Sequence, residues 1–471
     1  MTISWTPEIA EDGGPHYRRL ADAMQRDVLL GRLRPGERLP THRDLADRLG
    51  INVSTVTRAY REAERRGLLS ATVGRGTFVT ADPASGPAMM PPEPQAPGLL
   101  ELGLITPLYE LDPDLGDGLR RLSHRRDLAS LLHYAAPAGP EDHRRAGAEW
   151  AARFGRRAGP EDVVVCAGAQ HALAVSMASL FRPGERIAVG GLVFPGMKSL
   201  AAMLGLRLVP LPMDAEGPTP EGLDLACRRD KVAGVYLIAS LHNPTAAQAS
   251  PARREALAAT IRRHGLLLVE DDTFALASAV PGGQTQHEAT PDAISQLVPE
   301  HSVYIAGVSK TLCAGLRTTF AVAGRELRGR LAEGVLNTVW MAPPIGGALF
   351  ALWLKDGTAE RVLRAKAAEA ERLRRIALEA LEGFETASAP RGPFLWLSLP
   401  EPWTGATFEH RARELGVNLF GAEKFAVGDW PPPAAARMAL TSAGGEEPLR
   451  RALAVVRDIL RGNAVAEHPV M

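Results

Sequence analysis

The chain has 471 residues, of which 45% are hydrophobic and 23% charged, the composition of a globular protein with two or three domains. Its formal net charge is zero, which excludes an overall field that would draw the whole molecule to nucleic acid or to a membrane. Cys166, Cys227 and Cys313 are far apart and form no Cys-x-x-Cys pair, which argues against a disulfide framework or a zinc site. The N-terminus lacks a basic start followed by an apolar run, and no apolar stretch is long enough to span a membrane. We therefore expect a cytoplasmic protein that binds no metal and no membrane.

The charge is unevenly distributed along the chain. Residues 15–80 carry 13 arginines and no lysine against seven acidic residues, a local net charge of +6. Apolar residues recur at helical spacing from Tyr17 to Gly31 and predict a first helix. Thr41 is expected to cap a short helix that ends at Leu49, and a third helix is expected over Val53–Arg66. Two short helices joined by a tight turn predict a helix-turn-helix.

The next residues predict a β-hairpin wing. Leu68–Ala71 and Thr77–Thr80 are the expected strands, and Gly74-Arg75-Gly76 is the turn between them. The whole string from Leu39 to Val79 resembles the winged helix of GntR-type regulators. The resemblance implies that this module binds double-stranded DNA.

Several side chains of this module are candidates for DNA contacts. Those at the exposed start of the third helix can reach base edges in the major groove. They are Ser54, Thr55, Thr57 and Arg58. Arg43 and Arg75 are placed to neutralise phosphates or to enter the minor groove, although a merely solvated helix face remains the alternative for Arg58. The resemblance implies DNA contacts at Arg43 and Gly74, and it implies an arginine where this chain has Val53.

A proline-rich segment divides the chain. Residues 81–98 contain six prolines, cannot form helix or sheet ladders, and predict a semi-rigid linker between a DNA-binding module over 12–80 and a long region over 99–471. In that region short β-branched runs alternate with helical stretches. The runs are Asp162–Cys166, Arg186–Val189, Val232–Ile238, Leu266–Glu270 and Val303–Ile305. The alternation predicts an α/β fold with a mostly parallel sheet covered by helices on both faces.

A smaller α+β lobe is expected after the sheet. Lys355–Glu382 predicts a strong helix, and antiparallel strands are expected around Phe394–Leu399 and Met438–Thr441. We expect a large lobe over about 140–345 and a small lobe over about 99–139 and 355–465.

The segment GVSKTLCAGLR, from Gly307 to Arg317, is the most informative in the chain. It places Ser309 and Lys310 in a Ser-Lys-Thr turn and an arginine seven positions after the lysine, in a chain whose basic residues are nearly all arginine. A lysine amine can form a Schiff base with an aldehyde cofactor, and an arginine can hold the cofactor's phosphate. The segment resembles the cofactor-lysine segment of class I aminotransferases, the fold-type I enzymes that use pyridoxal 5′-phosphate (PLP). A surface lysine and arginine beside a turn is the alternative.

Further motifs follow in the order of that family. Gly168-Ala169-Gln170 opens a helix after a strand, where free amides favour a phosphate. The resemblance implies that Phe194 stacks on the pyridine ring, with a core phenylalanine as the alternative, and that Asn243 hydrogen-bonds the phenolic oxygen. Asp271 ends a buried strand and can pair with the pyridine nitrogen, whereas the neighbouring Asp272 better suits a helix cap. Lys310, Asp271 and Asn243 are thus the expected catalytic set.

Two more residues match and three depart. Tyr134 matches a tyrosine that reaches the phosphate of the partner subunit, and Arg437 matches the arginine that clamps a substrate carboxylate. Ala246 stands where the family usually has glycine, Phe274 where it has tyrosine, and Gly307 where it has a phosphate-binding serine. The last two changes remove a hydrogen bond each from the expected cofactor site.

The two halves together resemble the MocR-type arrangement of bacterial transcription regulators. The resemblance implies a homodimer, head-to-tail and domain-swapped, that binds a DNA operator and senses an amine, an amino acid or PLP itself through a Lys310 aldimine. A working aminotransferase with an accessory DNA module, capable of half or full transamination, stays open as an alternative. A degenerate domain that only dimerises is the third interpretation.

Overall fold

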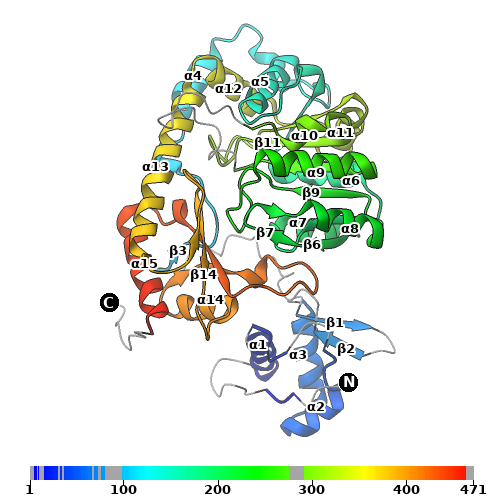
Figure 1. Cartoon of the computed structure of the whole chain (residues 1–471), viewed down its shortest axis with the longest axis vertical. Coiled ribbons are helices and arrows are strands. Elements are labelled where there is room, and N and C mark those ends of the chain that lie inside the picture. The colour runs from blue at the N-terminus through cyan, green and yellow to red at the C-terminus, as the bar shows by residue number, and fades with distance from the viewer. Residues whose placement is uncertain are drawn as a thin grey trace.

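The computed structural model describes most of the N-terminal module and nearly all of the α/β region (Figure 1). The described residues are 5–7, 9, 15–29, 32–33, 37–65, 68–72, 76–79, 98–274 and 291–462. Two of the expected DNA-binding residues, Gly74 and Arg75, lie outside them. Within these ranges no helix combines the length and the apolar character needed to cross a bilayer.

The N-terminal module has three helices followed by a hairpin. Its elements are α1 (His16–Leu29), α2 (His42–Leu49), α3 (Val53–Arg65), β1 (Leu69–Thr72) and β2 (Gly76–Val79). Thr41 caps α2 as predicted, because its side-chain oxygen accepts a hydrogen bond from the Asp44 N–H at 3.2 Å. Gly50 ends α2 in the left-handed region, with φ 62°. The described residues form the predicted helix-turn-helix and wing.

One hydrophobic core holds this module together. Leu20 and Met24 of α1, Leu45 of α2 and Val56 of α3 are fully buried in a single cluster. Tyr60 joins them and donates its hydroxyl to the Pro40 carbonyl at 2.8 Å, which satisfies the buried polar atom. The apolar positions that predicted the helices are therefore the ones that pack the helices together.

The α/β region is built on a seven-stranded sheet. The strand order is β4, β12, β11, β10, β9, β5, β6. In chain order the strands are β4 (Val163–Cys166), β5 (Arg186–Gly190), β6 (Arg207–Leu211), β9 (Gly234–Leu237), β10 (Leu267–Asp271), β11 (Ser302–Gly307) and β12 (Thr319–Ala323). All neighbours are parallel except β12, which runs antiparallel to both β11 and β4. The prediction of a mostly parallel sheet is confirmed, although β6 and β12 were not predicted.

Helices cover both faces of this sheet, as expected (Figure 1). Alternate residues of each strand face opposite sides. In β10, for example, Leu268 packs with α8 (Pro220–Asp230) and α9 (Pro251–His264), whereas Val269 packs with α6 (Ala169–Leu180) and α7 (Pro195–Met203). The remaining covering helices are α5 (Glu141–Ala152), α10 (Ile294–Leu297), α11 (Arg325–Val339) and α12 (Pro344–Lys355).

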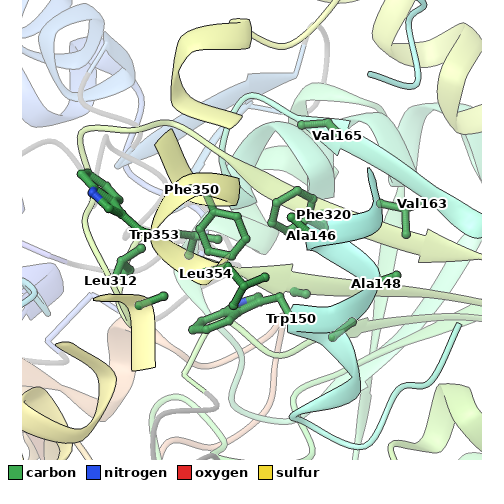
Figure 2. Close-up of a cluster of buried hydrophobic side chains, with 14 of the residues drawn as sticks. Ala146, Ala148, Trp150, Val163, Val165, Leu312, Phe320, Phe350, Trp353 and Leu354 are labelled. Carbon is green, nitrogen blue, oxygen red and sulfur yellow. The ribbon is translucent and has the colours of Figure 1, made fainter. Parts of the chain in front are cut away.

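Aromatic residues fill the core between α5, α12 and the sheet. Figure 2 shows Trp150 of α5 beside Phe350 of α12, and their ring centroids are 5.4 Å apart at 86°. Phe320 of β12 packs against Phe350 at 5.1 Å. Trp150 also donates its ring N–H to the Gly307 carbonyl at 3.3 Å, so this core supports the strand end from which the lysine loop begins.

The C-terminal part forms a second, smaller sheet. Its order is β13 (Thr386–Ala387), β14 (Phe394–Ser398), β17 (Ala435–Ala439), β16 (Phe420–Gly421), all antiparallel. The helix α13 (Thr358–Ala380) runs from the large sheet's cover to this lobe (Figure 1), and the predicted helix over 355–382 is confirmed. Two further strand pairs are β3 (Leu100–Glu101) with β15 (Val417–Asn418), and the hairpin of β7 (Met213–Asp214) with β8 (Gly217–Pro218). The remaining α-helices are α4 (Leu115–Ser123), α14 (Gly405–Glu414) and α15 (Glu446–Leu460). The short 3₁₀ helices are Tyr109–Leu111, Leu128–Leu132, Pro160–Asp162, Pro299–His301, Ala422–Lys424 and Leu440–Ser442.

Candidate functional site

Lys310 lies in the loop that follows β11, where the buried strand ends. Its Nζ donates a hydrogen bond to the Ile105 carbonyl at 2.5 Å. Burial, followed by the charges of Arg437 and Arg317, lowers the pKa of Lys310 from 10.5 to about 8. A lysine with a lowered pKa has a larger neutral fraction, which is the form that attacks an aldehyde.

Asp271 is the last residue of β10 and is buried. Its Oδ2 accepts a hydrogen bond from the Tyr236 hydroxyl at 2.9 Å, and its Oδ1 accepts one from the Thr273 hydroxyl at 2.5 Å. The pKa of Asp271 is raised above its ordinary value, because burial outweighs the hydrogen bonds from Thr273 and Tyr236, which lower it. The carboxylate therefore lies at the carboxyl end of a parallel strand, held from two sides.

Asp272 has a different role from the helix cap that the sequence suggested. Its Oδ2 accepts hydrogen bonds from the Ser240 hydroxyl and the Tyr304 hydroxyl, both at 2.8 Å. Burial, with a smaller contribution from the charge of Glu270, raises the pKa of Asp272 to about 6. Among the described residues, Asp272 caps no helix and instead joins neighbouring strands.

Gly168, Ser309 and Arg317 meet at the N-terminus of α6. Gly168 has φ 93°, and a Cβ atom at this position would clash with the Arg317 guanidinium. Arg317 in turn donates to the Ser309 hydroxyl at 3.5 Å. An arginine, a hydroxyl and free helix amides are thus brought together, and these are the groups that bind a phosphate.

The other expected residues of this region line the same end of the sheet. Ala169 and Gln170 form the first turn of α6, and the Gln170 amide donates to the Gly196 carbonyl at 3.5 Å. Phe194 precedes α7 and is half-buried, and its ring lies so close to Gly196 that a Cβ there would clash. Phe194 is therefore fixed beside the start of α6, and it packs against the core of the large sheet with part of its ring exposed.

Arg437 and Asn243 are in direct contact. Arg437, in the middle of β17, donates to the Asn243 side-chain oxygen at 2.7 Å and to the Gly103 carbonyl. The rings of Phe425 and Phe420 lie 5.0 and 5.4 Å from its guanidinium carbon. Burial lowers the pKa of Arg437 to about 9, and its Nε has no hydrogen-bond partner within the described part of the chain. Its hydrogen-bond partners among the described residues are both neutral, so the guanidinium can still bind a carboxylate.

Three residues depart from the family pattern, and the structure shows the backbone conformation or the neighbours of each. Ala246 has φ 61°, a left-handed conformation that favours glycine, which explains the usual glycine there. The Phe274 ring packs edge-on against Phe394, with centroids 5.6 Å apart. Gly307 ends β11 next to Thr273, and a Cβ atom on it would lie 3.0 Å from the Thr273 Cα.

Tyr134 is not brought to the other expected residues. Its side chain is 83% exposed, and its ring lies 5.5 Å from that of Trp340, which is 54% exposed. Other large apolar residues close to Tyr134 or Trp340 in the sequence are also exposed, namely Leu132, Val339 and Ile345. In a single copy of the chain, Tyr134 therefore belongs to an apolar surface patch.

The expected DNA-binding residues divide into two groups. Arg43 and Ser54 are exposed, so their side chains are available to a ligand. The Thr57 hydroxyl donates to the Val53 carbonyl at 2.9 Å, and the half-buried Thr55 donates its backbone N–H to the turn before the helix. The Arg58 guanidinium lies over a tyrosine ring of α1, 4.3 Å from the ring centroid. Thr57 and Arg58 therefore have partners within the module that the sequence did not predict.

Sequence reasoning missed four residues of these sites. Asn52 caps α3 through the Ser54 N–H at 2.8 Å, and an asparagine directly before a predicted helix was the available signal. Arg38 lies against the wing, where a Cβ on Gly76 would be 2.6 Å from its Nε. Tyr236 and Thr273 hold Asp271. The Tyr236 contact depends on strand register, which no spacing rule indicates, whereas Thr273 lies only two residues after Asp271 and the available signal was a hydroxyl residue in the turn after a strand-ending aspartate.

Comparisons with known proteins agree with both halves of the structure. Residues 16–79 match the bacterial regulatory proteins of the gntR family, and residues 117–456 match the family of aminotransferases class I and II. The HTH-type transcriptional regulator YdeF of Bacillus subtilis (strain 168) is 31% identical over 458 residues, 97% of each chain. The vitamin B6 salvage pathway transcriptional repressor PtsJ of Salmonella typhimurium (strain LT2) is 28% identical over 394 residues, 82% of this chain and 86% of PtsJ. Among solved structures, one similar to this chain is LysN, an α-aminoadipate aminotransferase of Thermus thermophilus complexed with N-(5′-phosphopyridoxyl)-L-leucine. The two superpose with a TM-score of 0.67 at 24% identity, over 78% of this chain and 93% of LysN, which shows a shared fold.

Proposed function

We propose that this chain, which belongs to the MocR-type subgroup of GntR-family transcription regulators, binds PLP at Lys310 and that this binding controls how its winged helix engages a DNA operator. The observation that carries the proposal is the surroundings of Lys310. A lysine with a pKa of about 8 lies at the carboxyl ends of the strands that also present Asp271, and a phosphate-binding corner lies at Arg317. Ligands of open α/β sheets bind at this edge.

The residues present fit PLP. When bound, PLP supplies an aldehyde for the lysine and an electron-withdrawing ring. Lys310 would hold it covalently, and Asp271 would pair with the ring nitrogen. Ser309, Arg317 and the first turn of α6 from Gly168 to Gln170 would hold its phosphate, and Phe194 would cover a ring face. The close approach of Arg317 to Gly168 supports this assignment, because any side chain at 168 would fill the corner.

Arg437 and Asn243 are suited to connect an effector with the cofactor. The Asn243 oxygen already accepts from Arg437, which leaves its amide N–H groups to donate to the phenolic oxygen of PLP. The Nε of Arg437, which has no partner among the residues that the structure describes, would bind one oxygen of an effector carboxylate. An amino acid is therefore the effector class that this corner favours, while a simple amine or PLP itself remains in the proposal.

A homodimer completes the proposed regulator. The exposed patch around Tyr134 and Trp340 is the kind of apolar surface that a second copy of the chain covers. In such a head-to-tail dimer Tyr134 would reach the phosphate in the partner subunit. Two winged helices would then read paired half-sites of duplex DNA.

An active aminotransferase is the second candidate, because Lys310, Asp271, Asn243 and Arg437 are all present and in contact with suitable partners. A domain that only dimerises is the third. Titration of the full-length protein with PLP, followed by visible absorption, separates them. We expect a band from covalently bound PLP that Lys310→Ala abolishes and that the exposed-lysine control Lys355→Ala retains. An unchanged spectrum in Lys310→Ala would sink both cofactor hypotheses, and steady turnover of an amino acid with a keto acid would favour the enzyme.

A further inference from the structure

Two hydroxyl groups hold the carboxylate of Asp271, one on each oxygen. Tyr236, on the neighbouring strand β9, donates to Oδ2 at 2.9 Å. Thr273 donates its hydroxyl to Oδ1 at 2.5 Å and its backbone N–H to the same oxygen at 3.2 Å. Burial holds the pKa of Tyr236 far above its ordinary value, so this residue stays protonated and acts as the donor. Both oxygens of Asp271 are therefore fixed before any ligand arrives.

The missing side chain at residue 307 makes room for the Thr273 hydroxyl. A Cβ atom on Gly307 would lie 3.0 Å from the Thr273 Cα and 3.2 Å from both its Cγ2 and its Oγ1. Contacts this short would push Thr273 away from its present position. The backbone of Gly307 cannot easily yield, because its carbonyl accepts hydrogen bonds from Trp150 at 3.3 Å and Thr311 at 3.2 Å.

Gly307 and Thr273 are therefore one coupled feature. A serine at 307, which the aminotransferase resemblance implies, would require Thr273 to move. In this chain residue 307 has no side chain, and the hydroxyl of Thr273 occupies the adjoining space and bonds the carboxylate instead. Compared with the pattern that the resemblance implies, residue 307 lacks a hydroxyl for the phosphate, and the Thr273 hydroxyl donates to Asp271.

We propose that Thr273 is a positioning residue which, together with Tyr236, orients the Asp271 carboxylate and favours its ionised form, and that Gly307 is required for this arrangement. The inference rests on the proposed function in one respect, since Asp271 must face the ring nitrogen of PLP. A hydrogen bond to an ionised carboxylate favours the ionised form, and an ionised Asp271 keeps the ring nitrogen protonated. Thr273 acts through Asp271 and needs no contact with the cofactor.

The test measures PLP affinity and the pH midpoint of the visible absorption in the full-length protein. Thr273→Val keeps the shape of the side chain and removes the hydroxyl, so we expect PLP affinity to fall about tenfold, the effect of one hydrogen bond to a charged group. We also expect the pH midpoint to rise, because a less fully protonated ring withdraws fewer electrons from the bond to Lys310. Thr273→Ser should restore both values, and Gly307→Ala should reproduce the valine variant by displacing the hydroxyl.

Tyr304→Phe is the matched control. It removes a buried hydroxyl of the same network that bonds Asp272 and not Asp271, so it should lower stability while leaving the pH midpoint unchanged. The proposal is overturned if Thr273→Val, or Thr273→Ala should the valine variant fail to fold, behaves as the unmodified protein, or if Tyr304→Phe shifts the midpoint equally. If the unmodified protein binds no PLP, the proposed function fails and this inference fails with it. If it binds PLP but Thr273 has no effect, only this inference fails.

Discussion

Lys310 is predicted to capture PLP far faster at neutral pH than an ordinary lysine. Its pKa is lowered from 10.5 to about 8, chiefly by burial. At pH 7.5 about a quarter of the Lys310 amines are then neutral, against about one in a thousand for a lysine of ordinary pKa. Because only the neutral amine attacks an aldehyde, the covalent bond should form about 200-fold faster than an unshifted lysine of equal nucleophilicity allows. The rate should rise about tenfold per pH unit up to about pH 7.5 and level off above pH 8.

Arg437→Met is the perturbation that tests the cause of this shift. Arg437 is the second contribution to the lowered pKa of Lys310, after burial, so its removal should move the midpoint of the pH–rate curve upward. Stopped-flow absorption of PLP capture between pH 6 and pH 10 measures the midpoint, with the exposed arginine variant Arg364→Met as the control. A midpoint above about pH 10 in the unmodified protein, or one that does not move in Arg437→Met, would refute the reasoning.

Three further predictions concern other parts of the chain. Arg43→Ala should weaken operator binding and reduce the slope of log affinity against log salt by about one, whereas Arg364→Ala on α13 should change neither. Gel-shift titrations at several salt concentrations measure both quantities. An unchanged slope in Arg43→Ala would contradict the assignment of Arg43 to a phosphate contact. Ala246→Gly should raise the free energy of unfolding by about 0.5–1 kcal/mol, because residue 246 has φ 61°, a left-handed conformation that strains alanine more than glycine. Urea titrations measure this, and a loss of stability would show that the alanine methyl contributes more than the strain costs. Trp340→Asp should shift the protein from dimer to monomer in sedimentation experiments, whereas Met203→Asp, also at an exposed apolar residue, should not; a dimer in both variants would mean that another surface is used.

Much of the fold could be predicted from local sequence. Strands such as β4 and β9 are short apolar runs that are buried at every position, so their composition indicates them directly. Thr41 and Gly50 mark the two ends of α2 by their capping chemistry. The strand β12 was not predicted, since it follows the lysine loop without a helix and runs antiparallel to both neighbours.

The sequence indicated candidate site residues but not the contacts among them. Family resemblance indicated Asn243 and Arg437 separately, and the hydrogen bond between them joins residues 194 positions apart. Asp272 differs from its expected role because burial between Ser240 and Tyr304 depends on the register of strands far apart in the sequence. Contacts of this kind follow from the tertiary fold, and no local pattern contains them.

The central claim, that PLP bound at Lys310 controls operator binding, is tested most directly by footprinting. The purified protein is placed on the DNA upstream of its own gene at near-physiological salt, with and without PLP, beside the Lys310→Ala variant. We predict a discrete protected region with paired half-sites, whose strength changes with PLP for the unmodified protein and stays constant for Lys310→Ala. A footprint that ignores PLP, or only weak binding to every sequence that salt removes, would contradict the account.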